Sequence, residues 1–214
     1  MTLATPARSV GMPGDALAPL LLPDELRLTA DQFEAVCHAN PDAVLELDAS
    51  GQVIHMTPTG SETGARNSTL LILLGLSLRA SGLPLKLFDS STGFRLPDGS
   101  VLSPDASLIQ LERWDTLSPP ERRGFAPLCP DLVVELASPS DEGPRGLTAL
   151  RRKMAAYQAN GARLGWLLIP EQQAVEVWPV GGGDTPQRIE SATSLDAGPQ
   201  FPGLQIDLQE IWQV

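Results

Sequence analysis

Cysteine, histidine and lysine are scarce in this sequence, and their scarcity excludes several kinds of site. The 214 residues include two cysteines, two histidines and two lysines, Lys86 and Lys153. Cys37 and Cys129 lie far apart and lack the close pairing of zinc ligands, so we interpret both as buried thiols. With so few nitrogen and sulfur ligands, we expect any bound metal to be a hard cation held by carboxylate oxygens.

Long apolar runs and a glycine-rich phosphate loop are also missing. The longest apolar run, residues 70–76, is too short to cross a bilayer, and no signal peptide precedes the first helical pattern. We therefore expect a cytoplasmic protein without a membrane segment. The glycines at 181–183 precede no helical pattern, which favours a hairpin turn over a nucleotide-binding loop.

Positive charge is in short supply. The chain has 15 Lys and Arg against 26 Asp and Glu, which gives a formal net charge of −11 at pH 7. Binding of nucleic acid through its phosphates depends on Lys and Arg, so this balance argues against loose, charge-driven binding. A local basic rim or bound metal ions could still reverse the field at one cleft.

The order of the predicted elements indicates an α/β fold. We expect an N-terminal arm over residues 1–22, followed by a single domain over 23–214. Within it the patterns predict a helix over 29–39, which begins with a capping box at Thr29 and Gln32, and then a hairpin over 44–56. An apolar helix over 63–80 comes next; we expect it to be packed on more than one side and to end at Gly82. Strands follow at 85–88, 93–96, 101–109 and 132–136, with a loop or short helix over 112–127. A helix over 146–160, strands at 164–169 and 175–180, and a docking segment over 201–212 complete the chain. This order predicts a mixed central β-sheet covered by helices on both faces.

Two carboxylates stand out against their surroundings. Glu135 lies in the apolar run LVVEL, which is typical of a central strand, where a carboxylate is costly without a partner. The alternative is a strand end that faces water. Asp105 follows Pro104, which suggests a strand edge or bulge, although a plain Asx turn explains it equally well. If the two strands are neighbours, about 4.8 Å apart, the carboxylates repel unless a cation lies between them.

Lys153 lies on the border of an apolar helical stripe. The stripe consists of Leu147, Leu150, Met154 and Tyr157. Lys153 can therefore lean toward the sheet, while its neighbour Arg152 points to solvent. The alternative is a surface lysine that lays its stem over the core.

These residues together resemble the Uma-two family of restriction endonucleases, within the PD-(D/E)XK nuclease superfamily. The resemblance rests on Ser103-Pro104-Asp105, on PDLVVELASPS over 130–140, on Lys153 and Tyr157 four residues apart, on Gly161, and on WLLIPE over 166–171. It extends from the opening helix near residue 28, through the early hairpin and the turn at 57–60, to the tail at 202–204. Relatives often carry a histidine after that turn, where this chain has SETG over 61–64.

The resemblance implies a restriction-endonuclease-like core in which Asp105 and Glu135 hold the catalytic metal, Mg²⁺ or Mn²⁺. The superfamily's lysine usually lies two residues after the second acid, where this chain has Ala137, so the resemblance assigns its role to Lys153. Glu46 on the hairpin matches an acidic position of the family and is either a further ligand or a carboxylate on the surface of a strand.

These expectations define a metal-dependent endonuclease. It would hydrolyse phosphodiester bonds in nucleic acid, with DNA as the expected partner, and would act as a homodimer because a double-strand cut needs two centres. Tyr157 would pack beside Lys153 and hydrogen-bond within the site. The alternative is an inactive nuclease fold that serves as a binding or assembly module, which the acidic charge favours.

Overall fold

A six-stranded mixed sheet lies at the centre of the computed structural model, which describes residues 22–23, 25–56, 59–141, 143–180 and 185–214. Its strand order is β10-β9-β8-β7-β6-β3. The strands are β3 (Leu85–Asp89), β6 (Ala106–Gln110), β7 (Leu132–Leu136), β8 (Leu164–Ile169), β9 (Ala174–Pro179) and β10 (Gln187–Ile189). Among these described strands only β7 and β8 pair in parallel, which requires a crossover, and helix α5 (Pro144–Ala159) provides it.

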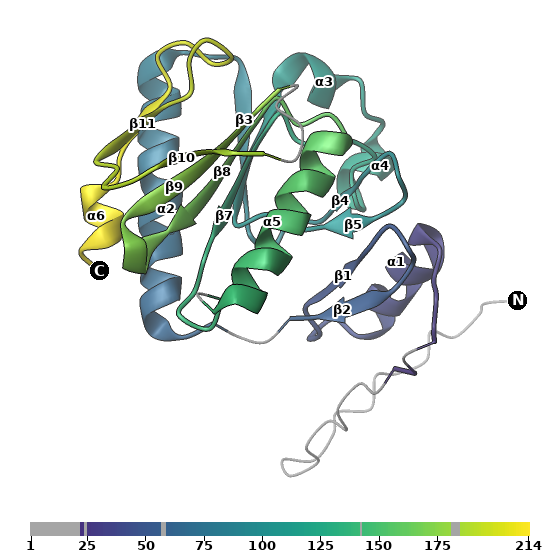
Figure 1. The fold of residues 1–214 in the computed structure, drawn as a ribbon. Helices are drawn as coiled ribbons and strands as arrows, with labels where there is room; N and C mark the ends of the chain where they lie inside the picture. Colours follow the sequence, from purple (N-terminus) through teal and green to yellow (C-terminus); the bar gives the residue numbers. More distant parts are fainter. Residues whose placement is uncertain (1–21, 24, 57–58, 142, 181–184) are drawn as a thin grey trace, which may run out of the picture.

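Helices cover both faces of this sheet, as the sequence predicted. Figure 1 shows α5 in front of the sheet and α2 (Ser61–Ser81) behind it. Leu70 and Leu74 of α2 are fully buried, but Ile72 and Leu76 are 62% and 60% exposed. The expectation that α2 is packed on more than one side was therefore wrong, because its outer face has no neighbouring element in the described chain. The helix ends at Gly82, whose φ of 65° is favourable for glycine.

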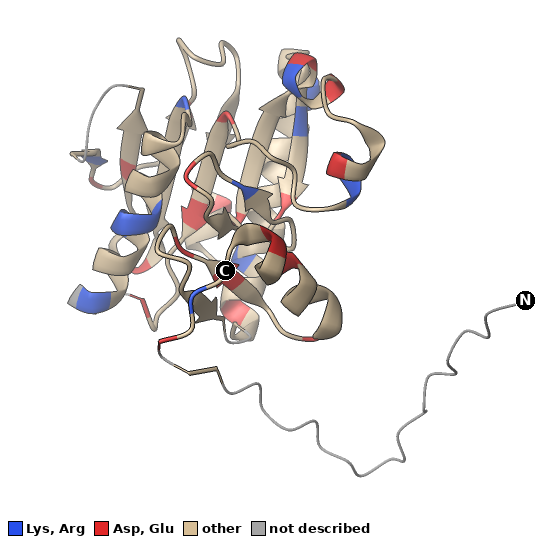
Figure 2. Cartoon of the chain, turned by 90° about the vertical axis from the view of Figure 1, so that its right-hand side faces the viewer, with Lys and Arg blue, Asp and Glu red and all other residues tan. Residues whose placement is uncertain are grey.

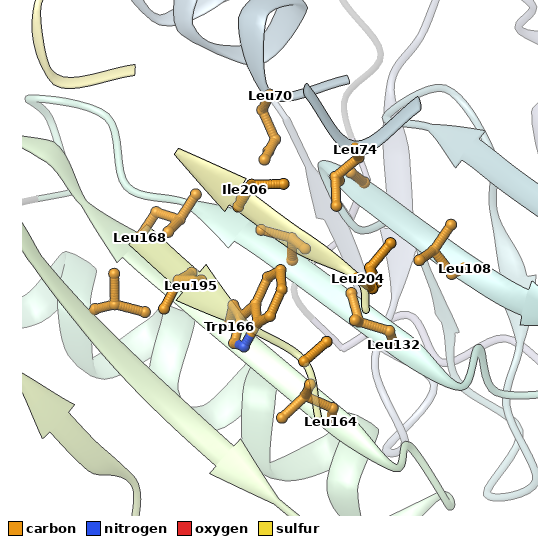
Figure 3. Close-up of a cluster of buried hydrophobic side chains, with 14 of the residues drawn as sticks. Leu70, Leu74, Leu108, Leu132, Leu164, Trp166, Leu168, Leu195, Leu204 and Ile206 are labelled. Carbon is orange, nitrogen blue, oxygen red and sulfur yellow. The ribbon is translucent and has the colours of Figure 1, made fainter. Parts of the chain in front are cut away.

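The C-terminal segment closes the core on the α2 side of the sheet. It contains β11 (Ser194–Asp196), β12 (Gln205–Asp207) and α6 (Gln209–Trp212). Figure 3 shows Leu204 and Ile206 between Leu70 and Leu74 on one side and Trp166 of the sheet on the other. The predicted docking segment is confirmed, whereas β10, β11 and β12 are short strands that the sequence patterns did not reveal.

A smaller layer is built by the N-terminal elements. Helix α1 (Ala30–Ala39) begins with the predicted capping box of Thr29 and Gln32. The predicted hairpin is confirmed as β1 (Leu45–Leu47) and β2 (Val53–His55), which join β5 (Val101–Leu102) and β4 (Phe94–Arg95) in a sheet of order β2-β1-β5-β4. Figure 1 shows this layer beside the main sheet, below α4.

The predicted strand over 101–109 is two strands in two different sheets. β5 belongs to the small sheet and β6 to the main one, with Ser103, Pro104 and Asp105 between them. Proline has no N–H to donate, so a continuous ladder is interrupted at this point. The stretch 112–127 contains two short helices, α3 (Leu111–Asp115) and α4 (Pro119–Arg123), and Pro170–Gln172 form one turn of 3-10 helix. The expected turn at 181–183 and all but the last residue of the expected arm lie outside the described residues.

Candidate active site

Asp105 immediately precedes β6 and lies beside Glu135 of the adjacent strand β7. β6 and β7 are antiparallel, with Ala106 opposite Val134, and continuing this register by one residue sets Asp105 opposite Glu135. The backbone N–H of Leu136 donates to Oδ2 of Asp105 at 2.8 Å. The strands are thus neighbours, as the pairing of the two acids required, and Asp105 bonds across strands rather than within a local Asx turn.

Glu135 is 3% exposed in the interior of the sheet. Its side chain points to the α5 face, because Val133 two residues earlier packs in the core under α5. Burial raises the pKa of Glu135 to about 8; Lys153 opposes this rise, while Asp105 and Glu46 add to it. A water-facing strand end is therefore the wrong interpretation. Burial also raises the pKa of Asp105, against the opposing effects of Lys153 and the Leu136 N–H.

Lys153 lies over these acids from α5. Its Nζ is 2.8 Å from Oε1 of Glu46 and 3.0 Å from Oε1 of Glu135, and it donates to the carbonyl oxygen of Ser103 at 2.9 Å. An ammonium group has three donors, so all three are used. Burial alone would lower the pKa of Lys153, but Glu135 and Glu46 raise it above its ordinary value. Lys153, whose side chain is 13% exposed, is thus a largely buried ion-pair partner and not a surface lysine, whereas Arg152 is exposed as expected.

Glu46 and Tyr157 complete the cluster. Glu46 is 4% exposed, and its Oε1 accepts from the backbone N–H of Ser103 at 2.8 Å as well as from Lys153. It is therefore not a strand-surface carboxylate. The hydroxyl of Tyr157 donates to Oε1 of Glu135 at 3.1 Å. Burial and the neighbouring Glu135 raise the pKa of Tyr157 well above its usual value, so the hydroxyl keeps its proton and remains a donor.

The sequence patterns did not identify the backbone of Ser103 as part of the site. Its N–H holds Glu46 and its carbonyl holds Lys153, so the link between β5 and β6 joins the hairpin, the helix and the sheet. Only main-chain atoms are involved, and residue type carries no signal for such contacts. The expected turn at 57–60 lies partly outside the described residues. In the segment 61–64, where the family resemblance suggested a histidine, Glu62 forms an ion pair with Arg66 at 2.7 Å, and Thr63 lines the cleft described next.

A cleft of about 730 Å³ opens over the cluster. Its lining includes Glu46, Asp105, Glu135 and Lys153. Figure 2 shows that positively charged residues are spread over several elements and lie beside acidic ones, without a continuous basic stripe in that view. The cleft therefore offers a charged centre without a broad electropositive surface around it.

The charges of the cluster do not balance when all its groups are ionised. Three carboxylates face one ammonium group. Two negative charges in excess are costly in a buried site unless protons or a cation compensate them. Asp105 and Glu135 supply the oxygen donors that Mg²⁺ or Mn²⁺ prefers.

The described residues contain no group of three or more His, Cys, Asp or Glu arranged to hold a metal. A cation on Asp105 and Glu135 would thus take its other ligands from water, backbone or substrate. This fits the habit of Mg²⁺, which binds through one or two carboxylates and keeps several waters.

A mixed sheet between helices, with two carboxylates on adjacent strands, is the architecture expected of a nuclease with a restriction-endonuclease-like core. The profile of the Uma2 family, described as "putative restriction endonuclease", matches residues 30–209, and the chain belongs to this family. The crystal structure of a putative nuclease from Anabaena variabilis is similar, with a TM-score of 0.67 and 19% sequence identity; the match covers 87% of this chain and 98% of that one. That likeness confirms the fold, and the family supports a nuclease. None of the curated proteins matches the chain, and no described helix is long and apolar enough to cross a membrane.

Proposed function

We propose that this chain is an endonuclease that hydrolyses phosphodiester bonds in DNA and depends on Mg²⁺ or Mn²⁺. The observation that carries the proposal is the excess of carboxylates over cations at the buried cluster, beside a cleft that is open to a ligand. A divalent cation would compensate this excess, and a phosphate group would supply some of its remaining oxygen ligands.

Asp105 and Glu135 are the metal ligands in this proposal. When bound, the cation supplies a water of lowered pKa and neutralises charge on the phosphate. The Tyr157 hydroxyl donates to Glu135, which fixes the orientation of that carboxylate. The Leu136 N–H does the same for Asp105.

Lys153 acts as a cation in this proposal and not as a base. A lysine in such a site can orient the water, remove its proton or stabilise the charge that develops in the transition state. Because its acidic neighbours raise the pKa of Lys153, it keeps its proton at neutral pH. Lys153 would therefore stabilise the negative charge on the phosphate through its own charge, while its three hydrogen bonds hold the acid cluster together.

The test is to incubate the chain with supercoiled plasmid and with single-stranded DNA, in Mg²⁺, in Mn²⁺ and in chelator. Cleavage is expected in either metal and not in chelator. Asp105→Ala and Glu135→Ala are each expected to abolish cleavage without loss of the fold. Cleavage by either variant at the parent's rate would refute the assignment of the ligands. A double-strand cut would need two centres and hence two copies of the chain, which sedimentation velocity with and without duplex would detect.

A second candidate is an inactive nuclease fold that binds another molecule. The net charge of −11 favours it, because phosphate binding gains little from such a chain. Thermal unfolding separates the two candidates, since a metal that binds the native state raises the melting temperature. A rise at millimolar Mg²⁺ or Mn²⁺ that is absent from Asp105→Ala supports the enzyme, and no rise supports the inactive fold.

A further inference from the structure

The β1–β2 hairpin has apolar side chains on both of its faces. Successive strand residues point to opposite faces, and the pairing of Glu46 with Ile54 sets these two on the same face. The other face carries Leu45, Leu47 and Val53, which pack with α1 in a small core. An antiparallel pair with one buried face normally carries polar residues on the other. Here the face that leads Glu46 into the site is apolar as well.

Three exposed apolar side chains make up that second face. Val44, Ile54 and Met56 are 58%, 39% and 40% exposed, and all three line the cleft together with Glu46. The N–H of Met56 donates to the carbonyl of Val44 at 2.9 Å, which continues the hairpin pairing and keeps all three on one face. We call Val44, Ile54 and Met56 the hairpin wall. Contiguous exposed apolar side chains in a cleft are typical of a surface that contacts a ligand.

The position of the hairpin wall identifies its occupant as the substrate. Glu46 reaches Lys153 from the same face, so a molecule that rests on the wall also reaches the acid cluster. The cations available in the cleft are few. Its lining has six carboxylates, those of Glu46, Asp48, Asp98, Asp105, Glu135 and Asp141, against the two cations Arg152 and Lys153. Affinity for a nucleic acid must therefore come largely from its bases rather than from its phosphates.

A duplex and a single strand differ in whether their bases are free to contact the hairpin wall. In a duplex the faces of the bases are stacked on one another, and the outside presents phosphates and base edges. In a single strand the base faces are free to lie against side chains, as they do in proteins that bind single strands. We propose that the hairpin wall binds the nucleobases of a single-stranded nucleic acid whose phosphodiester lies at the acid cluster. This inference rests on the proposed function, which makes a nucleic acid the substrate, and a single-strand cut needs only one centre.

A pair of double variants isolates the hairpin wall from exposed apolar surface in general. Ile54→Thr with Met56→Gln makes the wall polar and leaves Glu46 in place. Ile72→Thr with Leu76→Gln is the matched control, because these two side chains are equally apolar, more exposed, and lie on the outer face of α2 away from the cleft lining. Val44→Thr is an independent single variant of the wall. Equal melting temperatures would verify that all variants are folded.

The measurement is fluorescence anisotropy in Ca²⁺ with a labelled oligothymidylate, with an abasic strand of the same length and charge, and with a duplex. The parent is expected to bind the strand with bases roughly tenfold more tightly than the abasic strand, and more tightly than the duplex. The wall variants should lose this preference, while the control keeps it. The inference would be overturned if the parent bound the oligothymidylate and the abasic strand equally, or if the wall variants kept the parent's preference. The hairpin wall would then be a contact surface for a protein partner instead. Equal loss in the control would overturn the inference too.

Hydrolysis of bis(p-nitrophenyl) phosphate separates this inference from the function on which it rests. This compound has a phosphodiester bond but no nucleobase. If the parent and the wall variants hydrolyse it equally in Mg²⁺ or Mn²⁺ and no base preference is found, the inference fails and the proposed function stands. If nothing is hydrolysed although the base preference depends on the wall, the proposed function fails and the wall remains a site for single strands.

Discussion

Replacing Glu135 by glutamine should stabilise the metal-free protein at alkaline pH. The pKa of Glu135 is raised by burial from its usual 4.5 to about 8. The folded state then binds a proton that the unfolded state has already lost, so the stability due to this group is present below about pH 4.5 and disappears as pH rises to about 8. At about 1.4 kcal/mol for each pKa unit, this corresponds to about 5 kcal/mol. Polarisable surroundings reduce the observable change to about 2–3 kcal/mol. Glutamine does not titrate and still accepts the hydrogen bond from Tyr157.

Urea unfolding in chelator at pH 5, 7 and 9 measures the effect. The free energy of unfolding of Glu135→Gln minus that of the parent should increase by about 2–3 kcal/mol from pH 5 to pH 9. In thermal unfolding this would be a difference of about 4–12 °C for a chain of this size. Mg²⁺ should stabilise the parent at pH 9 and have little effect on the variant. Glu112→Gln, at an exposed position on α3, is the control. Parallel pH profiles for the parent and Glu135→Gln would refute the reasoning.

Three further predictions concern other groups. Lys153→Met leaves buried carboxylates without their cation and should lower cleavage by at least about a hundredfold, whereas Lys86→Met, at the other lysine, should not; equal rates in a plasmid assay would contradict this. Burial raises the pKa of the Cys129 thiol to about 12. A thiol reagent at pH 8 should therefore modify Cys129 only after unfolding, while the partly exposed Cys37 reacts first. Peptide mass mapping checks this, and modification of Cys129 in the native protein would contradict it. Glu176 is 2% exposed and accepts from the guanidinium groups of two arginines, so Glu176→Leu should cost about 1–3 kcal/mol in urea unfolding, and an unchanged midpoint would contradict that estimate.

The parts of the site that depend on local pattern could be predicted from the sequence. The apolar run around Glu135 has no alternation, and this identified a strand buried on both faces. The stripe on α5 has a helical period, and this gave the side on which Lys153 lies. In both cases the prediction needed only the period of a single element and a rule about where charge is costly.

Contacts between distant segments could not be predicted in the same way. Glu46 lies 107 positions before Lys153. The pattern of the hairpin alone does not show that the face carrying Glu46 points toward the acid cluster. The family resemblance singled out Glu46 but left its role open between a ligand and a surface group. The division between β5 and β6 was missed for a related reason, since both segments are extended and largely buried, and the sheet that each one joins is set by distant strands.

The acidity of the chain has a different meaning once the cluster is located. As a bulk property, a net charge of −11 opposes binding to phosphates. At the site, however, the carboxylates outnumber the nearby cations, so each divalent ion that binds removes repulsion inside the protein as well as repulsion toward the substrate. The binding of metal and the binding of a phosphodiester would then favour each other, because the first reverses the local field that opposes the second. This coupling predicts that nucleic acid affinity rises with metal occupancy in the parent and no longer responds to metal in Asp105→Ala.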